Sequence, residues 1–319
     1  MSLGAYAGAT DTGRTRRRNE DYYVVAPPLF CVADGMGGAQ AGEVASRLAA
    51  AAVEDVVDHD GRSGPGRVTA LIQEANRRVY ERASADPTVS GMGTTMTVAL
   101  VEQDGVTIGH VGDSRAYLVR DGTLTQLTDD HSLVNELVKS GRLSREEAEQ
   151  HPQRSVITRA LGTDPDVDVD AFTVDAQPGD LFLLCSDGLT SMVDNEEILS
   201  LLERNRADLK SATRSLLNAA NRGGGEDNIT VVTFEIAEDG GDTLVIPAVR
   251  EDDTLDGQSA VSVAETVENV LVEPDGDPPE VQASVEPAPG VSTARTRLVL
   301  TMLVLLAVAA VLLVWGLVR

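Results

Sequence analysis

The sequence predicts an α+β domain in which sheets pack on each other and helices cover the outside. Short apolar runs typical of buried strands come in groups, and long amphipathic stretches typical of helices come in pairs between them. Strands grouped between helix pairs favour a layered architecture over a strictly alternating one. The sequence also predicts a disordered linker after this domain and one transmembrane helix near the C-terminus.

The individual elements follow from periodicity and turn residues. Glu43–His59 is rich in alanine, with valine and leucine on one face, and Gly66–Ala85 carries apolar residues at helical spacing. A hairpin turn is expected at Asp121-Gly122. The other predicted helices are His131–Gln150, in two pieces broken at Ser140-Gly141, then Asn195–Glu203, with Asp194 or Asn195 as N-cap, and Asp208–Asn221. The predicted strands are Leu29–Ala33, Gly93–Val101, Gly105–His110, Ala116–Val119, Ala171–Val174, Leu181–Cys185 and Ile229–Ile236.

Composition limits the class of protein. The 319 residues carry a net charge of −25, which excludes a nucleic-acid binder because such a protein needs a basic face. The two cysteines, Cys31 and Cys185, lie inside apolar runs and are expected to be buried core residues. No secretory signal precedes the domain, so we expect a reducing, cytoplasmic setting.

The chain divides into three parts. Residues 1–237 are the expected folded domain, 238–296 the linker and 297–319 the anchor. Between Glu238 and Gly290 there are 14 acidic residues and one basic residue, together with several prolines and no aromatic residue. Such a segment should be extended and disordered, and it would hold the domain away from an anionic membrane surface.

A membrane span is predicted at Leu298–Val318, which has 21 residues and no charge. About 20 apolar residues cross a bilayer. A buried core helix seldom runs this long without a polar face. Arg295 and Arg297 precede the span, so the positive-inside rule predicts a single-pass protein of the cell membrane with its large domain in the cytoplasm.

Acidic residues at the ends of apolar runs indicate a metal centre. Asp34 follows Leu29–Ala33, and Asp187 and Asp113 also follow strand-like runs. Asp227 lies just before the last predicted strand. Each of these residues alone would be an ordinary turn or cap residue, but together they suggest one site. Carboxylates without a histidine or cysteine cluster favour Mg²⁺ or Mn²⁺ over Zn²⁺.

A second acidic set stands near the N-terminus, in Arg16-Arg17-Arg18-Asn19-Glu20-Asp21. Basic residues just before Glu20 and Asp21 suit a site that holds an anion and a metal. An arginine there would bind phosphate through two parallel hydrogen bonds. If the carboxylates converge, two cations could activate a shared water for in-line displacement at phosphorus. For at least one of the three arginines we expect only a solvated surface role.

Six short motifs occur along the chain. They are Arg16-x-x-Asn19-Glu20-Asp21, Asp34-Gly35-Met36-Gly37-Gly38, Gly91-x-Gly93-Thr94-Thr95, Gly112-Asp113-Ser114-Arg115, Ser186-Asp187-Gly188-Leu189 and Glu226-Asp227-Asn228-Ile229-Thr230. In kind and order these motifs resemble those of the metal-dependent Ser/Thr protein phosphatases, the protein phosphatase type 2C or PPM family. The resemblance covers residues 5–236, and the overall layout looks like that of bacterial, membrane-tethered members that oppose Ser/Thr protein kinases.

This resemblance implies a four-layer α-β-β-α sandwich, in which helix pairs flank two antiparallel sheets. It implies that Asp34 bridges two Mn²⁺ or Mg²⁺ ions, that Asp187 and Asp227 complete the first ion's shell, and that Asn228 orients Asp227. The Gly35 carbonyl and the Glu20-Asp21 pair would serve the second ion, Asp113 with Asp187 would bind a third, and Arg16 would bind the substrate phosphate.

Two further expectations come with the resemblance. Residues 128–162 correspond to a mobile flap beside the active site, where His131, Ser155 and Arg159 are candidates for substrate contact. Many eukaryotic members have a histidine after the Asp-Gly as general acid, whereas this chain has Met36. The leaving group must then take its proton from a metal-bound water or His131, and we expect structural roles for His59, His110 and His151.

The leading hypothesis is therefore an enzyme that hydrolyses phosphoserine and phosphothreonine in proteins, among them Ser/Thr protein kinases. A phosphatase for an anti-sigma-factor antagonist is a second possibility, which the acidic tether and the span fit less well. The alternative outside enzymes is a membrane-anchored pseudophosphatase scaffold that binds phosphoproteins. The complete set of Asp34, Asp187 and Asp227 argues for the enzyme.

Overall fold

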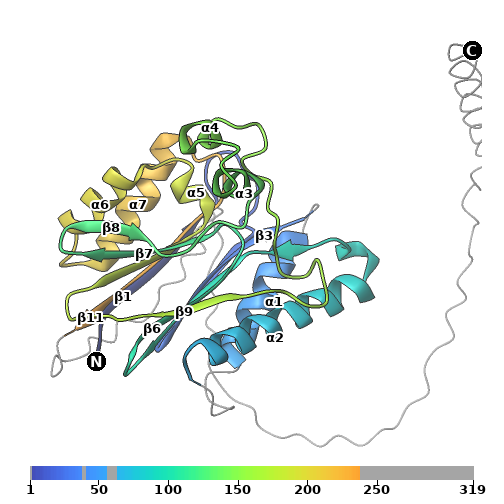
Figure 1. The fold of residues 1–319 in the computed structure, drawn as a ribbon, viewed down its shortest axis with the longest axis horizontal. Coiled ribbons are helices and arrows are strands. Elements are labelled where there is room, and N and C mark those ends of the chain that lie inside the picture. The colour runs from blue at the N-terminus through green and yellow to red at the C-terminus, as the bar shows by residue number, and fades with distance from the viewer. Residues whose placement is uncertain (1, 38–40, 56–62, 238–319) are drawn as a thin grey trace, which may run out of the picture. The chain divides into compact units, whose positions relative to one another are not determined.

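The computed structural model describes residues 2–37, 41–55 and 63–237, and these form an α+β fold with two antiparallel sheets (Figure 1). One sheet contains, in spatial order, β1 (Ser2–Asp11), β11 (Ile229–Ala237), β10 (Leu181–Cys185), β7 (Arg115–Arg120) and β8 (Thr123–Gln126). The other contains β2 (Asp21–Ala26), β3 (Leu29–Met36), β5 (Met96–Glu102), β6 (Gly105–Val111) and β9 (Asp170–Val174), and β4 (Gly93–Thr94) pairs with the end of β3.

Helices cover the outer face of each sheet, so the described residues form four layers (Figure 1). Alanine and valine side chains of α1 and α2 pack on the sheet that contains β3, and α6 and α7 pack on the sheet that contains β10. The helices of these two layers are α1 (Ala41–Asp55), α2 (Gly64–Ala85), α6 (Asn195–Arg204) and α7 (Leu209–Gly223). The short elements are η1 (Pro87–Val89) and α5 (Asp187–Thr190).

Strands that are apolar throughout are buried on both faces, as β10 illustrates. Leu183 and Cys185 pack toward α6 and α7, whereas Phe182 belongs to the core between the sheets. There Phe182 and Phe30 each stack on Phe234, with ring centroids 5.0 and 4.4 Å away. Burial on both faces explains why these runs lack the alternation of a half-exposed strand.

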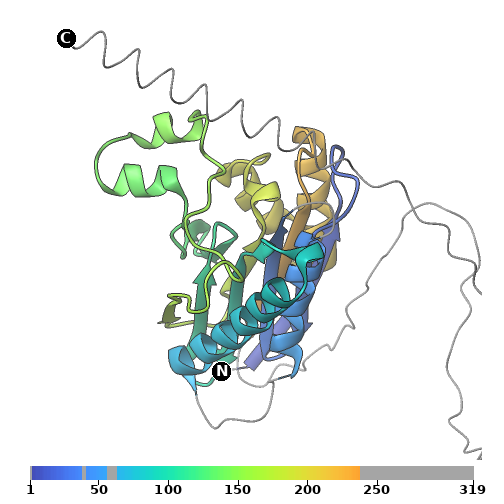
Figure 2. The same ribbon diagram turned by 90° about the vertical axis from the view of Figure 1, so that its right-hand side faces the viewer.

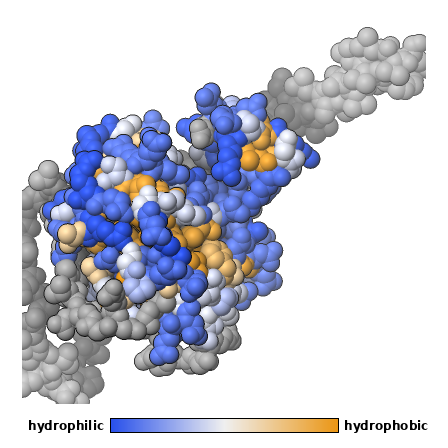
Figure 3. Space-filling model, turned by 60° about the vertical axis from the view of Figure 1, so that its left-hand side comes forward, coloured by the Kyte–Doolittle hydropathy of each residue, from blue (hydrophilic) through white to orange (hydrophobic). Residues whose placement is uncertain are grey.

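The segment between β8 and β9 contains residues 128–162, for which we keep the name flap. It contains α3 (Leu133–Lys139) and α4 (Arg145–Glu149), which stand off from the layers in Figure 2. Ser132 caps α3 by accepting a hydrogen bond from the Asn135 amide, and Ser144 begins α4 in a capping box. On the face shown in Figure 3, hydrophilic side chains predominate. Among the described residues, the large apolar side chain that is exposed belongs to Val156, in this same segment.

Most predicted elements are confirmed. Strands β1 and β2 and the short elements η1 and α5 were not expected, and the single strand expected at Gly93–Val101 is divided at Thr95. Cys31 and Cys185 are buried, free thiols, as predicted. Among the described residues no helix is long and apolar enough to cross a membrane. The predicted linker 238–296, the span 298–318 and His59 lie outside the described residues.

Candidate metal centre

Five aspartates come from strand ends at one end of the sandwich. Asp34 is near the end of β3, Asp187 follows β10, and Asp113 follows β6. Asp21 begins β2 and lies opposite Asp34 in the antiparallel register, while Asp227 precedes β11. Because neighbouring strands run in opposite directions, the start of one strand lies beside the end of the next. The fold therefore gathers residues that are distant in the sequence.

The aspartates are close enough to raise one another's pKa. Burial raises the pKa of Asp34 well above its usual range, and the charges of Asp21, Asp187, Asp113 and Asp227 raise it further. Burial and the Asp187 charge raise the pKa of Asp113 to about 7, and burial and Asp227 raise that of Asp187 to about 6. Like charges held together in an apolar setting disfavour ionisation, and a nearby cation would reverse the shift.

Two oxygens of this cluster have no partner. Asp21 Oδ2 accepts hydrogen bonds from the hydroxyls of Thr230 (2.6 Å) and Ser186 (2.8 Å), but its buried Oδ1 accepts none. The buried Asp113 Oδ1 is also without a hydrogen-bond donor. Burial without a partner is costly for a carboxylate oxygen. Both oxygens are thus suited to a cation.

Asp34 is held in place by its neighbours. Its amide donates to Thr95 Oγ1 (3.0 Å), which in turn shares a hydrogen bond with Ser114 Oγ (2.8 Å). Within the described part of the chain, no three His, Cys, Asp or Glu side chains are placed so that they could hold a metal ion as they stand.

The Gly35 carbonyl and Glu20 converge on a second point. A Cβ on Gly42 would lie 2.7 Å from both the Gly35 oxygen and Glu20 Oε2. A side chain there would fill the space between these two oxygens, so Gly42 keeps it open. Burial raises the pKa of Glu20 despite the opposing charge of Arg16. Oxygen donors alone, two of them buried and unpartnered, fit a hard divalent cation.

Arg16 and Asp227 form an ion pair at the edge of this cluster. The Arg16 guanidinium donates to Asp227 Oδ2 (2.8 Å), and both side chains are partly exposed. The Asn228 backbone amide donates to Asp227 Oδ1 (2.8 Å), whereas the prediction that the Asn228 side chain orients its neighbour stays a prediction. This contact comes from the backbone. The Asn228 side chain instead donates to the carbonyls of Thr12 and Arg18 (both 2.9 Å).

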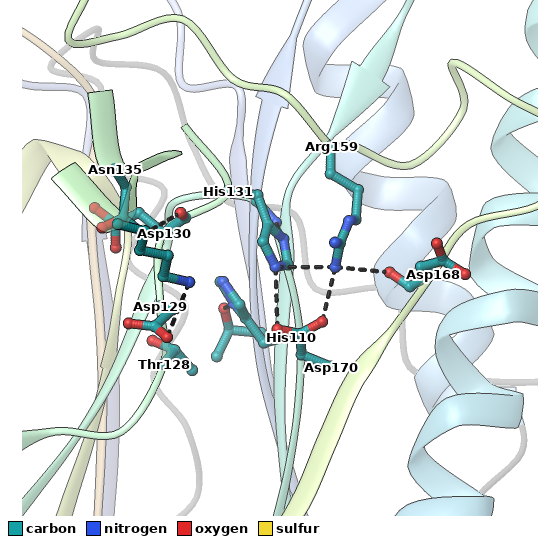
Figure 4. A network of polar contacts seen from close by, with 12 residues as sticks. His110, Thr128, Asp129, Asp130, His131, Asn135, Arg159, Asp168 and Asp170 are labelled. Atoms are coloured by element: carbon teal, nitrogen blue, oxygen red, sulfur yellow. Dashed lines mark hydrogen bonds and ion pairs between the residues drawn. The ribbon is translucent and has the colours of Figure 1, made fainter. Parts of the chain in front are cut away.

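His131 lies in a second polar cluster, beside Arg159 and Asp170 (Figure 4). We call these three residues the flap clasp, because His131 and Arg159 come from the two ends of the flap and Asp170 begins β9. Arg159 donates to Asp170 Oδ1 (2.7 Å), and its Nη1 lies 3.0 Å from His131 Nε2. The Thr158 amide also donates to the His131 carbonyl (2.8 Å). The flap is therefore closed at its base.

Both ring nitrogens of His131 have polar neighbours. The Gly112 amide donates to Nδ1 (3.0 Å), so in the neutral ring the proton is on Nε2, which lies 3.3 Å from Asp170 Oδ2. Burial and the charge of Arg159 lower the pKa of His131, which favours this neutral form. The ring packs 4.8 Å from that of the fully buried His110. His131 thus joins the flap to the loop that carries Asp113.

The structure brings the five predicted aspartates within electrostatic range of one another, with Glu20 and Arg16 beside them, whereas the three flap candidates do not form one group. His131 and Arg159 belong to the clasp, and Ser155 is exposed. Sequence reasoning did not select the hydroxyls of Thr95, Ser114, Ser186 and Thr230, although all four stand in the quoted motifs. It also did not select Asp170, whose only signal is an acidic residue before a predicted strand.

Comparisons with known proteins agree with this geometry. A model of the family described as Protein phosphatase 2C matches residues 15–226. The chain is 42% identical over 240 residues to the serine/threonine phosphatase stp of Listeria welshimeri, a match that covers 71% of this chain and 93% of that protein.

Solved structures show the same fold. The Mycobacterium tuberculosis serine/threonine phosphatase PstP/Ppp matches with a TM-score of 0.71 and 40% identity over 74% of this chain and 100% of that one. The catalytic domain of PstP in complex with two manganese ions matches with a TM-score of 0.67 and 38% identity, over 74% and 99%. The chain therefore belongs to the protein phosphatase 2C family and is a serine/threonine protein phosphatase of that type.

Proposed function

We propose that this phosphatase removes phosphate from phosphoserine and phosphothreonine in proteins with two or three divalent cations, Mn²⁺ or Mg²⁺, bound at the aspartate cluster. The observation that carries the proposal is the gathering of Asp21, Asp34, Asp113, Asp187 and Asp227, whose like charges oppose one another. The relative solved with two manganese ions supports two of these cations.

The residues divide between the proposed ions as the resemblance implies. Asp34, Asp187 and Asp227 would hold one cation, and Asp34, the Gly35 carbonyl and the Glu20-Asp21 pair a second. Asp113 with Asp187 would hold a third. Such cations would lower the pKa of a coordinated water and neutralise charge on the phosphoryl group.

Arg16 would bind the phosphate of the substrate. Its guanidinium already contacts a carboxylate of the cluster, so it reaches the place where a phosphate would meet the cations. Phosphate can replace Asp227 as its partner, because both offer paired oxygens to the planar guanidinium. The pair is partly exposed, so exchanging one partner for the other costs little.

The position after Asp34-Gly35 holds no histidine that could donate a proton to the leaving serine or threonine. Met36 occupies that position, and its side chain lies against Gly93. His131 was the sequence candidate, but its Nδ1 accepts from Gly112, its Nε2 lies between Asp170 and Arg159, and only 7% of the residue is exposed. We therefore infer that water supplies this proton and that His131 positions the Asp113 loop.

We further propose that the protein is tethered to the cell membrane and opposes Ser/Thr protein kinases in the cytoplasm. The support is in the sequence, in the acidic linker 238–296 and the uncharged run Leu298–Val318. Deleting 297–319 should release the enzyme from the membrane fraction. If the truncated protein still sediments with membranes, the anchor is elsewhere.

The test of the proposed reaction is phosphate release from a phosphothreonine peptide by residues 1–237 and by the full chain, first with Mn²⁺ and then with EDTA. Release that EDTA abolishes is expected. A folded protein that binds Mn²⁺ and the phosphopeptide but releases no phosphate would instead be a phosphoprotein-binding scaffold.

A further inference from the structure

The loop between β1 and β2 presents a concentrated positive charge beside the metal centre. Arg14, Arg16, Arg17 and Arg18 lie within five consecutive residues, and all are exposed. Residues 1–237 contain 37 acidic and 22 basic residues, so the domain as a whole carries −15. This loop is therefore positively charged within a domain of negative net charge. Its electrostatic field attracts negatively charged groups that approach the site.

The loop backbone is fixed. The Asn228 side chain donates to the carbonyls of Thr12 and Arg18, and the Gly225 carbonyl accepts from the amide of Arg14 (2.7 Å). Gly13 adopts a φ of +79°, and a Cβ there would lie 2.2 Å from the Asp227 carbonyl oxygen. The arginines are thus presented from a rigid support that rests on the metal-centre residue Asp227.

The guanidinium groups differ in their partners. Arg16 is paired with Asp227, and Arg18 acts on the charge of Glu20. Within the described ranges, the side chains of Arg14 and Arg17 have neither a hydrogen-bond nor an ion-pair partner. The stem of Arg14 passes close to Gly225, so its position is limited. The positively charged side chains of Arg14 and Arg17 are therefore available to a bound molecule.

We propose that Arg14 and Arg17 form a docking surface for acidic or phosphorylated residues of the substrate that flank its target phosphoresidue. The proposal rests on the function proposed above, in which Arg16, a member of the same loop, holds the target phosphate. A bound polypeptide advances about 3.3 Å per residue, so its next few residues must pass the loop. The protein would then prefer phosphoproteins with acidic sequences around the modified residue.

The acidic segment of this chain, Glu238–Gly290, could bind the same arginines. The substrate is favoured because Arg16 would hold its phosphate within the loop itself, which keeps the flanking residues of the substrate beside Arg14 and Arg17. Binding of the chain's own segment is an outcome that the experiment distinguishes.

The experiment uses the full chain with Mn²⁺ and three phosphothreonine peptides whose flanking residues are acidic, neutral or basic. We expect KM to be lower for the acidic than for the neutral peptide by up to roughly fivefold, with kcat unchanged, because exposed ion pairs contribute about 0.2–1 kcal/mol. The difference should shrink at high ionic strength. The double variant Arg14→Gln, Arg17→Gln should lose the preference, and Arg214→Gln, an exposed arginine on α7, should keep it.

Equal KM values for all three peptides would overturn the docking surface. A preference for the acidic peptide that appears in residues 1–237 but not in the full chain would also overturn it, and would assign the arginines to Glu238–Gly290. Hydrolysis of p-nitrophenyl phosphate, which has no flanking residues, distinguishes failure of the docking surface from failure of the phosphatase function. If it is metal-dependent while the peptides are not distinguished, the phosphatase function stands and only the docking surface fails.

Discussion

The metal centre and the flap clasp differ in the charges that they bring together, which are alike in the centre and opposite in the clasp. The centre collects aspartates whose charges raise one another's pKa, and two of their oxygens have no partner. In the clasp, Arg159 and Asp170 are oppositely charged, and although burial raises the pKa of Asp170, hydrogen bonds from Arg159 and His131 bring it below its usual value. The clasp is complete within the chain, whereas the centre requires cations. Substitutions should therefore separate function from stability.

The largest effect is expected for Asp34→Asn. Hydrolysis of a phosphopeptide with Mn²⁺ should fall close to background, because partners that only orient metal ligands already contribute about 10- to 100-fold. The melting temperature in EDTA should not fall, since the change removes a repelled charge. Asp104→Asn, an exposed aspartate in the β5–β6 turn, is the control. Normal turnover by Asp34→Asn would remove Asp34 from the metal site.

Arg16→Ala should come next. A hydrogen bond to a charged group contributes about 1.5–3 kcal/mol, so KM should rise by roughly 10- to 150-fold with kcat nearly unchanged. Stability should hardly change, because the Arg16–Asp227 pair is partly exposed. Steady-state kinetics measures KM and kcat of this variant, with Arg214→Ala as the control. A collapse of kcat at constant KM would mean that Arg16 acts in the transition state.

The sequence was sufficient to predict the five aspartates that the fold gathers, because each lies in a motif beside the start or the end of a strand. It was not sufficient for β1, whose Ser2–Asp11 consists largely of small, partly buried residues without an apolar alternation. The division of Gly93–Val101 at Thr95 has a tertiary cause. The Thr95 amide donates to the Asp34 carbonyl, and its hydroxyl accepts from the Asp34 amide.

The contacts within the clasp could not be predicted from the sequence either. Its members are 28 and 39 positions from His131, and only the packing of β9 beside β6 brings them together. The same holds for the Asn228 side chain, which contacts carbonyls more than 200 positions away. Side-chain contacts of this kind depend on the final geometry, and local patterns do not record them.

The pH dependence of stability should distinguish the centre from the clasp. Burial and the Asp187 charge raise the pKa of Asp113 from 3.8 to about 7, so the folded, metal-free state binds this proton more tightly than the unfolded state. Its contribution to the free energy of unfolding is therefore greatest below about pH 4 and is lost as the pH rises to about 7, at roughly 1.4 kcal/mol per pKa unit.

Thermal unfolding in EDTA between pH 5 and 8 tests this, with the wild type compared to Asp113→Asn, which cannot ionise. The variant should show a shallower decline and the higher melting temperature above about pH 7. Mn²⁺ should then raise the wild-type melting temperature most at the upper end of this range. Parallel curves for the two proteins would mean that Asp113 ionises normally in the folded state.

His131→Ala should destabilise the fold by about 1–3 kcal/mol, because the buried Gly112 amide loses its acceptor. For a domain of this size each kcal/mol lowers the melting temperature by roughly 2–4 °C. The loss should appear equally in EDTA and with Mn²⁺, unlike that of a metal ligand. His151→Ala, in the flap but outside the clasp, is the matched control. An unchanged melting temperature would mean that the clasp does not stabilise the flap base.

The smallest effect is expected for Asp170→Asn, which keeps the size of the side chain but removes its charge. Asp170 is about half exposed, so its pair with Arg159 should contribute at most about 1 kcal/mol and less at high salt. Limited proteolysis within residues 128–162 is the more sensitive measurement, because it reports opening of the flap base without unfolding. Faster cleavage than in Asp168→Asn, whose backbone carbonyl is its contact with Arg159, would assign the effect to the charge of Asp170. Equal cleavage of the two variants would mean that the neutral contacts, from Gly112 to His131 and from Thr158 to the His131 carbonyl, close the flap without the ion pair.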